Sequence, residues 1–194
     1  LSLIIQTLPT LAVAVNRFMC NRLNISRYPL FLMGILLIGQ LVFGRFAGFA
    51  GALGRTTGML AAICLVFGVI LILGAALQFR KQKTTVDPTK APNKLVTSGL
   101  FRWSRNPMYV GMLLILLVQP LLTLRPHLFV FALAFFMIMN FWVIPREETV
   151  VKNIFGQQYE AYCAKTKRWA NLQLILVLLV LGSAVPLLLS LSNV

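Results

Sequence analysis

The stretch from Thr57 to Phe79 reads TGMLAAICLVFGVILILGAALQF and contains no charged residue. A helix needs roughly 20 predominantly apolar residues to cross the hydrocarbon core of a bilayer, and this stretch is long enough. Because hydrocarbon offers no partners for backbone N–H and C=O groups, a segment within it must satisfy them internally, as a helix does. The stretch therefore predicts a transmembrane helix, and it sets the class of the whole chain.

Further apolar runs flank this stretch on both sides: Leu1–Val15, Tyr28–Gly44, Met108–Leu124, Leu128–Ile144 and Leu172–Leu191. The first run is the weakest, because Gln6 and Pro9 interrupt it. The sequence predicts an all-α, polytopic integral membrane protein with five transmembrane helices, or six if the first run also crosses. Residues 1–194 are expected to form one membrane domain.

The composition excludes most other classes of protein. Of the 194 residues, 59% are hydrophobic and 11% are charged, whereas soluble domains average about 45–50% apolar and about 25% charged residues. A disordered chain would be poor in apolar residues and rich in charge. None of the three cysteines stands in a C-x-x-C pair, and there is one histidine, so no metal site is expected.

The charge pattern predicts the orientation in the membrane. Lys and Arg number 18 against 4 acids. Threading the runs alternately through a bilayer places 15 of these basic residues on one side, in the connections 16–27, 80–106 and 145–171. Cytoplasmic loops carry the excess of Lys and Arg, so these connections are expected to face the cytosol. The basic excess therefore indicates topology and contact with membrane lipids, and no nucleic-acid partner is expected.

A polar site is predicted where the connection 80–106 meets the next apolar run. Pro107 favours the first turn of a helix, and the free N–H groups of that turn would attract an anionic group. Arg105 adds a permanent charge with planar geometry for a carboxylate. Gly99 permits a positive φ or a close backbone approach. Alternatively, Arg105 is only an interfacial anchor.

A second polar segment begins where Pro145 is expected to end the fifth run. In a helix over 146–169, Glu148, Phe155, Tyr159 and Tyr162 would share one face, which predicts an amphipathic helix lying on the membrane surface. Glu147 and Glu148 would then approach Arg105 beside an apolar cavity. Alternatively, these glutamates only form ion pairs with nearby arginines.

Two segments carry a resemblance. LVTSGLFRWSRNPMYVG at 95–111 and REETVVKNIFGQQYEAY at 146–162, with Arg168 and Trp169 after it, resemble the signatures of the isoprenylcysteine carboxyl methyltransferase family. The compact chain looks like a prokaryotic or archaeal member of that group, which is related to phospholipid methyltransferases. Asn106 stands where the family usually has His, and Val151 where it usually has Leu. Because Asn does not titrate near neutral pH, proton transfer by a histidine at this position is excluded.

The resemblance implies S-adenosylmethionine as cofactor, S-adenosylhomocysteine as product, and methylation of the C-terminal carboxylate of a prenylated cysteine at the cytosolic face. It divides the chain into scaffold spans (1–80), a cofactor-binding and catalytic region (94–169) and a C-terminal apolar helix (172–191). The implied cofactor-binding residues are Leu95, Val96, Gly99, Leu100, Asn106, Pro107, Tyr109, Gly111 and Glu147. The implied catalytic residues are Arg105, Arg146, Glu147, Glu148 and Arg168.

Within that implied site, Arg105 and Arg146 would hold the acceptor carboxylate. Glu147 or Glu148 would approach a polar group of the cofactor or orient Arg105. Carboxyl methylation needs correct placement of the reactants more than a general base. If the acceptor were a lipid amine, Glu147 or Glu148 would be the candidate base.

Three alternatives remain open at this point. One is a methyltransferase that acts on a phospholipid or another small lipid. Another is an NADPH-dependent membrane enone reductase, because reductases of that kind share a similar second signature. The third is a non-enzymatic membrane protein, which would be expected to carry polar or charged residues within its spans. The oligomeric state is left open.

Overall fold

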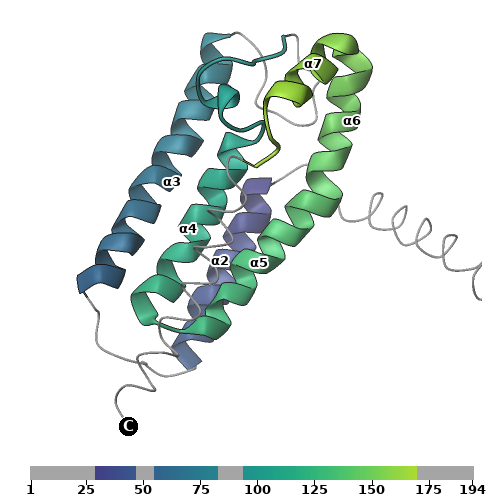
Figure 1. Ribbon diagram of the computed structural model, residues 1–194. Coiled ribbons are helices and arrows are strands. Elements are labelled where there is room, and N and C mark those ends of the chain that lie inside the picture. Colours follow the sequence, from purple (N-terminus) through teal and green to yellow (C-terminus); the bar gives the residue numbers. More distant parts are fainter. Residues whose placement is uncertain (1–28, 47–54, 83–93, 170–194) are drawn as a thin grey trace, which may run out of the picture.

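The computed structural model describes residues 29–46, 55–82 and 94–169, and every regular element in these ranges is helical. Figure 1 shows the helices running side by side. The predicted runs at 1–15 and 172–191 lie outside the described residues, so the number of spans stays a prediction. The α-helices are α2 (Pro29–Phe46), α3 (Arg55–Lys81), α4 (Pro107–Thr123), α5 (Phe129–Ile138), α6 (Ile144–Phe155) and α7 (Gln157–Lys165). Short helical turns lie at η2 (Gly99–Arg102), η3 (Pro126–Leu128) and η4 (Met139–Val143).

The prediction of an all-α membrane protein is confirmed for the described residues. Three helical segments are long and apolar enough to cross a membrane: Pro29–Phe46, Thr57–Lys81 and Pro126–Phe155. The helix Pro107–Thr123 is also apolar but shorter. Each of the four predicted runs between residues 28 and 144 is thus helical, while their orientation relative to the cytosol stays a prediction.

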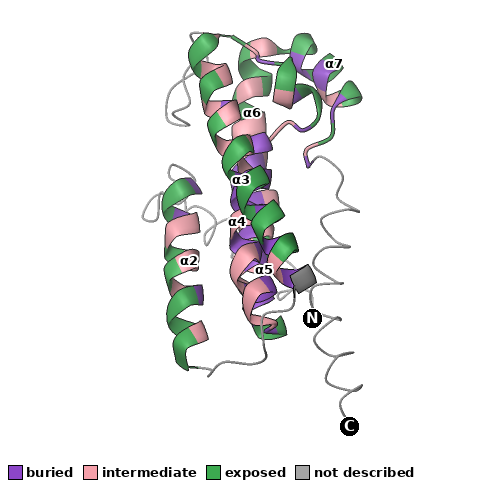
Figure 2. Cartoon of the chain, turned by 90° about the vertical axis from the view of Figure 1, so that its left-hand side faces the viewer, coloured by how far each residue is buried: buried purple, intermediate pink, exposed green. Residues whose placement is uncertain are grey.

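The surface of the bundle is apolar where a bilayer would surround it. Large hydrophobic side chains of α2 and α3 are exposed, among them Phe31 at 67% and Leu73 at 57%. Figure 2 shows that exposed residues cover the outer faces of these helices while buried ones face inward. In water such a surface would favour aggregation, whereas in a bilayer it is the expected contact with lipid.

Glycines allow α3 and α4 to pack closely along their length. A Cβ on Gly111 would lie 2.6 Å from the carbonyl oxygen of Gly68, and one on Gly68 would lie 2.9 Å from that of Gly111. Small residues at such crossings let two backbones approach inside a membrane, where packing replaces the hydrophobic effect. This contact fixes the start of α4 against α3.

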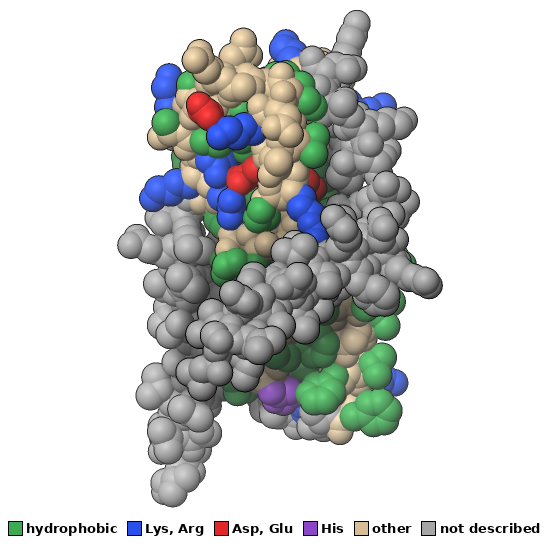
Figure 3. All heavy atoms as spheres, turned by 90° about the vertical axis from the view of Figure 1, so that its right-hand side faces the viewer, with side chains coloured by type: hydrophobic (Ala, Val, Ile, Leu, Met, Phe, Trp, Pro, Cys, Tyr) green, Lys and Arg blue, Asp and Glu red, His purple; other side chains and the backbone are tan. Residues whose placement is uncertain are grey.

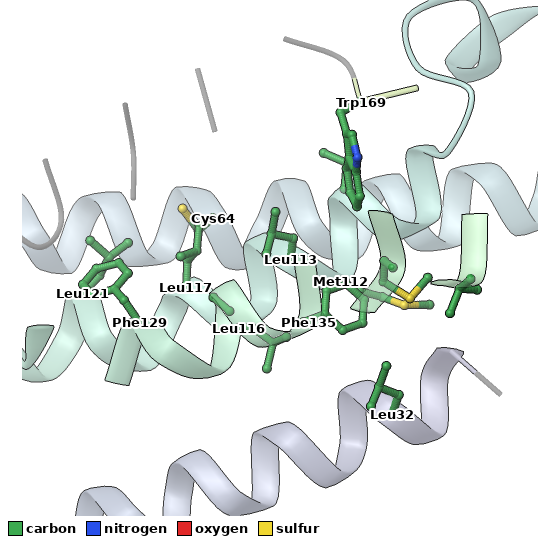
Figure 4. Packing of buried hydrophobic residues seen from close by; sticks show 14 of the residues in the cluster. Leu32, Cys64, Met112, Leu113, Leu116, Leu117, Leu121, Phe129, Phe135 and Trp169 are labelled. Carbon is green, nitrogen blue, oxygen red and sulfur yellow. The ribbon is translucent and has the colours of Figure 1, made fainter. Parts of the chain in front are cut away.

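The centre of the bundle is a core of large apolar side chains. Leu113, Leu116 and Leu117 of α4 meet Phe135 of α5 there, and all four are at most 1% exposed. Figure 4 shows these side chains between the helices, with Trp169 at one end of the cluster. The core therefore joins the apolar spans to the segment that follows α7.

Pro145 marks the end of the fifth apolar run, but the helix continues past it. The helix runs from Pro126 to Phe155, and the π-turn η4 joins α5 to α6 just before Pro145. Proline lacks an N–H group, and its ring collides with the carbonyl four residues earlier in a regular α-helix. The wider π-turn accommodates this proline, so the chain leaves the apolar run without ending the helix.

The predicted single amphipathic helix over 146–169 is also corrected. Gly156 has a φ of +51° and ends α6, after which α7 runs from Gln157 to Lys165. Residues 166–169 are not helical. Glu148 and Tyr159 therefore belong to two helices rather than to one face of a single helix.

Candidate active site

The two polar segments that carry the sequence signatures meet at one end of the bundle. Residues 166–169 cross the start of α4, where the Arg105 N–H donates to the carbonyl of Lys167 at 3.0 Å. The Ser104 hydroxyl and the Asn106 amide both donate to the carbonyl of Arg168, at 3.0 and 3.2 Å. Figure 3 shows basic and acidic side chains gathered at this end. Segments about sixty residues apart thus form one polar site.

Glu148 lies between two arginines. Its Oε1 accepts from Arg105 Nη2 at 2.8 Å and from Arg168 Nε at 3.1 Å, and its Oε2 accepts from Arg168 Nη2. The three side chains are only 14–30% exposed, so solvent screens them weakly. The hydrogen bond from Arg168 to Glu148 raises the pKa of Arg168 above its ordinary value. Of the roles predicted for the glutamate pair, contact with Arg105 belongs to Glu148.

The remaining donors of Arg105 bind the backbone of α7 and the segment after it. Arg105 Nη1 donates to the carbonyls of Cys163 and Thr166, at 3.4 and 3.1 Å. A cation is favoured at a helix C-terminus, where the last carbonyls carry partial negative charge. Arg105 Nε is buried and has no hydrogen-bond partner among the described residues. Arg105 therefore joins α4, α6 and α7 and keeps one donor uncommitted.

Glu147 has a different environment from its neighbour. Its Oε1 accepts a hydrogen bond from the Tyr109 hydroxyl at 2.6 Å. Across the ranges that the structure describes, no lysine or arginine forms an ion pair with Glu147. Adjacent glutamates thus have distinct surroundings: Glu148 forms ion pairs with two arginines, while Glu147 is a partly buried carboxyl group beside a phenol.

Asn140 is a site residue that the sequence did not assign to the site. The Asn140 Oδ1 accepts from Trp169 Nε1 at 3.0 Å and from Arg168 Nη1 at 3.3 Å. Asn140 lies in the π-turn η4, a type of irregularity that is frequent at functional sites. An amide in an otherwise apolar run was the available signal.

Gln78 is a second residue that the sequence did not reveal. From the end of α3 its amide donates to the carbonyl of Ser98 and accepts from the Leu100 N–H at 3.2 Å. Gly99 between them has a φ of +58°, which confirms the predicted positive φ. A Cβ at Gly99 would collide with the Gln78 amide. Gln78 therefore fixes the turn at η2 to α3.

The loop before η2 is held by side-chain packing rather than by backbone hydrogen bonds within the described residues. No backbone hydrogen bond joins residues 95–97 to any other residue within the described ranges. Val96 is 6% exposed and packs with Ala75 and Phe101, so its side chain anchors the loop. Behind it, the buried Tyr162 hydroxyl donates to the carbonyl of Phe101, and burial raises the pKa of Tyr162 to about 12.

The other predicted site residues occupy varied positions. Pro107 begins α4 as expected, and Asn106 precedes it without capping the helix through its side chain. Gly111 lies at the crossing with Gly68, where it serves helix packing. Arg146 is half-buried in the first turn of α6, next to Glu147. Contact of these residues with cofactor or acceptor stays a prediction.

Comparison with known proteins gives one family. Residues 56–158, just over half of the chain, match the phospholipid methyltransferase family. An uncharacterized protein of Haemophilus influenzae is 36% identical over 62 residues, which cover 32% of this chain and 98% of that protein. No solved structure matches the chain. The family match includes Arg105, Glu147 and Glu148, and it ends before Arg168.

Proposed function

Because the chain belongs to the phospholipid methyltransferase family, we propose that it transfers a methyl group from S-adenosylmethionine to a lipid acceptor. The proposed site is the end of the bundle that carries Arg105 and Glu148. This family is among the membrane methyltransferases related to the isoprenylcysteine group. Methyltransferases of this kind generally use that cofactor. The expected orientation places this end at the cytosolic face of the membrane.

The residues at the site suit the cofactor. S-adenosylmethionine carries a carboxylate, an ammonium group and ribose hydroxyls, which need donors and acceptors. Arg105 Nε is a buried donor without a partner in the described part of the chain, and the backbone of residues 95–97 offers further groups. Glu147 could accept from the ammonium group or the hydroxyls. When bound, the cofactor supplies an electrophilic methyl group on a sulfonium, which is a good leaving group.

The different partners of Glu147 and Glu148 are the main support for the proposed methyl acceptor. Arg105 and Arg168 both form ion pairs with Glu148, so two of the basic residues proposed for the site are engaged by the protein itself. Among the described residues, Glu147 is bound by a phenol and by no cation, so it can attract or deprotonate an ammonium group. We therefore favour an amine acceptor such as an aminophospholipid headgroup.

In such a reaction the residues of the chain have three tasks. Glu147 takes a proton from the acceptor ammonium, because only the neutral amine has a lone pair for the new N–C bond. Tyr109 holds Glu147 in place through its 2.6 Å hydrogen bond. Arg105, Glu148 and Arg168 fix α4, α6 and the segment after α7 together, so that the reactants meet at the distance and angle that the reaction needs.

The sequence signatures favour a second candidate, the C-terminal carboxylate of a prenylated cysteine. A carboxylate is already nucleophilic and requires no base. Arg105 Nε, the donor that Glu148 does not engage, and Arg146 would hold it, and Glu147 would then serve the cofactor. The isoprenoid chain would enter between the helices from the bilayer.

The test is binding followed by turnover. We expect S-adenosylhomocysteine to bind the detergent-purified protein saturably in a calorimetric titration, with NADPH as the comparison. Methyl transfer from labelled S-adenosylmethionine is then measured with phosphatidylethanolamine and with a farnesylated cysteine. NADPH binding would support the reductase, and absence of both would support a non-enzymatic protein.

Glu147→Gln separates the acceptors. With an amine acceptor, the substitution is expected to lower kcat at least about 100-fold, in the range of a general base, and to make the loss smaller at high pH. With a carboxylate acceptor, kcat is expected to change little. Glu160→Gln is the matched control, because Glu160 of α7 forms an exposed ion pair with Lys152 of α6, away from the candidate site.

A further inference from the structure

Arg125 is buried at the end of the bundle opposite the active site, in the connection between α4 and α5. It is 2% exposed, and its Nη1 donates to the carbonyl of Gly44 at 3.3 Å. Its Nε and Nη2 are also buried, and they have no hydrogen-bond partner among the described residues. An arginine stays charged at physiological pH, and a buried charge without a counter-charge is strongly unfavourable.

Two glutamines, Gln40 of α2 and Gln119 of α4, lie at the same end of the bundle. Gln40 is 0% exposed, and its Nε2 donates to the carbonyls of Leu116 and Leu128, at 3.0 and 3.3 Å. Gln119 lies against Gly44, where a Cβ would approach the Gln119 Nε2 within 2.5 Å. The Oε1 atoms of Gln40 and Gln119 are buried and lack a partner in the described ranges. We call Gln40, Gly44, Gln119 and Arg125 the rim cluster.

No acidic side chain of the described residues lies near Arg125. The chain has four acids, of which Glu147, Glu148 and Glu160 lie on α6 and α7 at the other end. Asp87 comes five residues after Gln82, and an extended chain of that length spans at most about 18 Å. The 27-residue helix α3 that separates Gln82 from the rim cluster is about 40 Å long. Because no described residue supplies this counter-charge, an external anion can supply it.

The depth of the rim cluster indicates the source of that counter-charge. Arg105 and Arg125 flank α4, whose 17 residues span about 26 Å, close to the roughly 30 Å thickness of a hydrocarbon core. If Arg105 lies at one headgroup layer, Arg125 lies at the other, where phosphates of phospholipids are the abundant anions. The guanidinium fork suits a phosphate, which it can bind through two parallel hydrogen bonds.

The surroundings of the cluster fit access from that layer. Arg45 and Phe46, which follow Gly44, are exposed, and so are Pro126 and His127, which follow Arg125. The cluster therefore lies directly beneath the surface of this end. The two uncommitted amide oxygens could accept from a hydroxyl or ammonium group, which phospholipid headgroups carry next to their phosphate.

We propose that Arg125, Gln40 and Gln119 bind the phosphate of a phospholipid headgroup in the leaflet opposite the active site. This lipid is a structural ligand rather than the methyl acceptor. Its phosphate neutralises the buried guanidinium, and its headgroup satisfies the amide oxygens. The site is independent of the proposed reaction, because the rim cluster shares no residue with it.

The test compares probes on the full chain, purified in a phosphate-free detergent and stripped of lipid. Dioctanoyl phosphatidylglycerol is expected to raise the Tm by about 3–5 °C through selective binding to the folded state. Dioctanoylglycerol, which has the same chains without phosphate, is expected to leave the Tm unchanged. Inorganic phosphate is the third probe, and an equal shift with it would assign the site to free phosphate and overturn the lipid source.

Matched variants locate the effect. Arg125→Gln is expected to abolish the shift, whereas Arg45→Gln, which removes one positive charge from the exposed surface of the same end, is expected to keep it. Methyl transfer by Arg125→Gln at saturating acceptor is expected to stay near the level of the unsubstituted protein. A full shift in Arg125→Gln would overturn the proposal, since the lipid would then bind elsewhere, the active site included.

A second measurement decides the matter even if Arg125→Gln does not fold. Native mass spectrometry of the unsubstituted protein, released from membranes in mild detergent, is expected to show a retained phospholipid that inorganic phosphate does not displace. Equal Tm shifts from phosphatidylglycerol and dioctanoylglycerol, together with a lipid-free mass, would contradict the proposal. Internal waters on Arg125 would then be the better account.

Discussion

The two ends of the helix bundle differ in whether their buried arginines have a carboxylate partner among the described residues. At the active-site end, Arg105 and Arg168 share the carboxylate of Glu148. At the rim cluster, Arg125 is more deeply buried and has no acidic partner among the described residues. The first arrangement includes a carboxylate of the chain, while the second is proposed to bind an external anion. The comparison indicates that ion pairs within the chain stabilise one end, whereas the other end is proposed to be stabilised by a phospholipid.

Removing the shared carboxylate is expected to have the largest effect. Glu148→Gln leaves the two partly buried guanidinium groups without a counter-charge, so the active-site end would resemble the rim cluster. Breaking a fully buried pair costs about 3–5 kcal/mol, and partial exposure lowers the expectation here to about 2–3 kcal/mol. Thermal unfolding and methyl transfer are the measurements, and both should fall.

Glu160→Gln is the control for this change, because it breaks the Lys152 pair, whose side chains are 56–60% exposed. Surface pairs contribute about 0–1 kcal/mol. Equal losses of stability in the two variants would contradict the idea that Glu148 holds the active-site end together.

Helix packing can be separated from this charge network at the crossing of α3 and α4. In Gly111→Ala, the new Cβ would lie 2.6 Å from the Gly68 carbonyl oxygen, so the helices must move apart. Overpacking of this kind costs about 1–3 kcal/mol, and the measurement is the Tm. Gly34→Ala on α2 is the control, since a Cβ there meets nothing within 4 Å. A Tm change no larger than that of Gly34→Ala would show that the crossing tolerates separation.

A smaller loss is expected when only the support of Arg168 is removed. Asn140→Ala deletes the acceptor for Trp169 Nε1 and for Arg168 Nη1, and the expected cost is about 1–2 kcal/mol. Because Glu148 still holds Arg168, methyl transfer should fall less than in Glu148→Gln. The ratio of kcat/KM between the two variants measures this, and a greater loss in Asn140→Ala would reverse the order of importance.

The smallest predicted effect concerns alkaline pH. Because the folded pKa of Tyr162 is raised to about 12 from an ordinary value of about 10, the folded state holds this proton more tightly than the unfolded state. Its contribution to stability is complete below pH 10 and falls as the pH rises towards 12. Tyr162→Phe should therefore lose less stability than the unsubstituted protein over this range, as followed by Tm. Parallel curves for the two proteins would refute this assignment.

Apolar periodicity and turn residues were enough to predict much of the fold. The runs from Tyr28–Gly44 to Leu128–Ile144 are helical because a bilayer leaves a long uncharged segment no alternative. Gly99 adopts a positive φ, a conformation that glycine populates more readily than other residues. These features depend on neighbours in sequence or on the solvent, and both can be inferred without coordinates.

The residues of the candidate site were predictable from the sequence, but which glutamate pairs with Arg105 was not. The sequence brings Arg105 near two adjacent glutamates, yet it cannot tell which one pairs. The π-turn at Met139–Val143 decides this, because it shifts the rotation of every later residue of that helix relative to a regular α-helix. The same turn allows Pro145 to stay inside the helix, which simple reading of proline as a helix end did not anticipate.

The crossing of residues 166–169 over the start of α4 has a consequence for biogenesis. Residues 166–169 are synthesised after Arg105 and Glu148, so these two residues exist before the segment that contacts them. A nascent chain that stops at Lys165 would contain every described helix and still lack Arg168, which also pairs with Glu148. Under the proposed function, activity that needs Arg168 is therefore expected only after translation has passed residues 166–169.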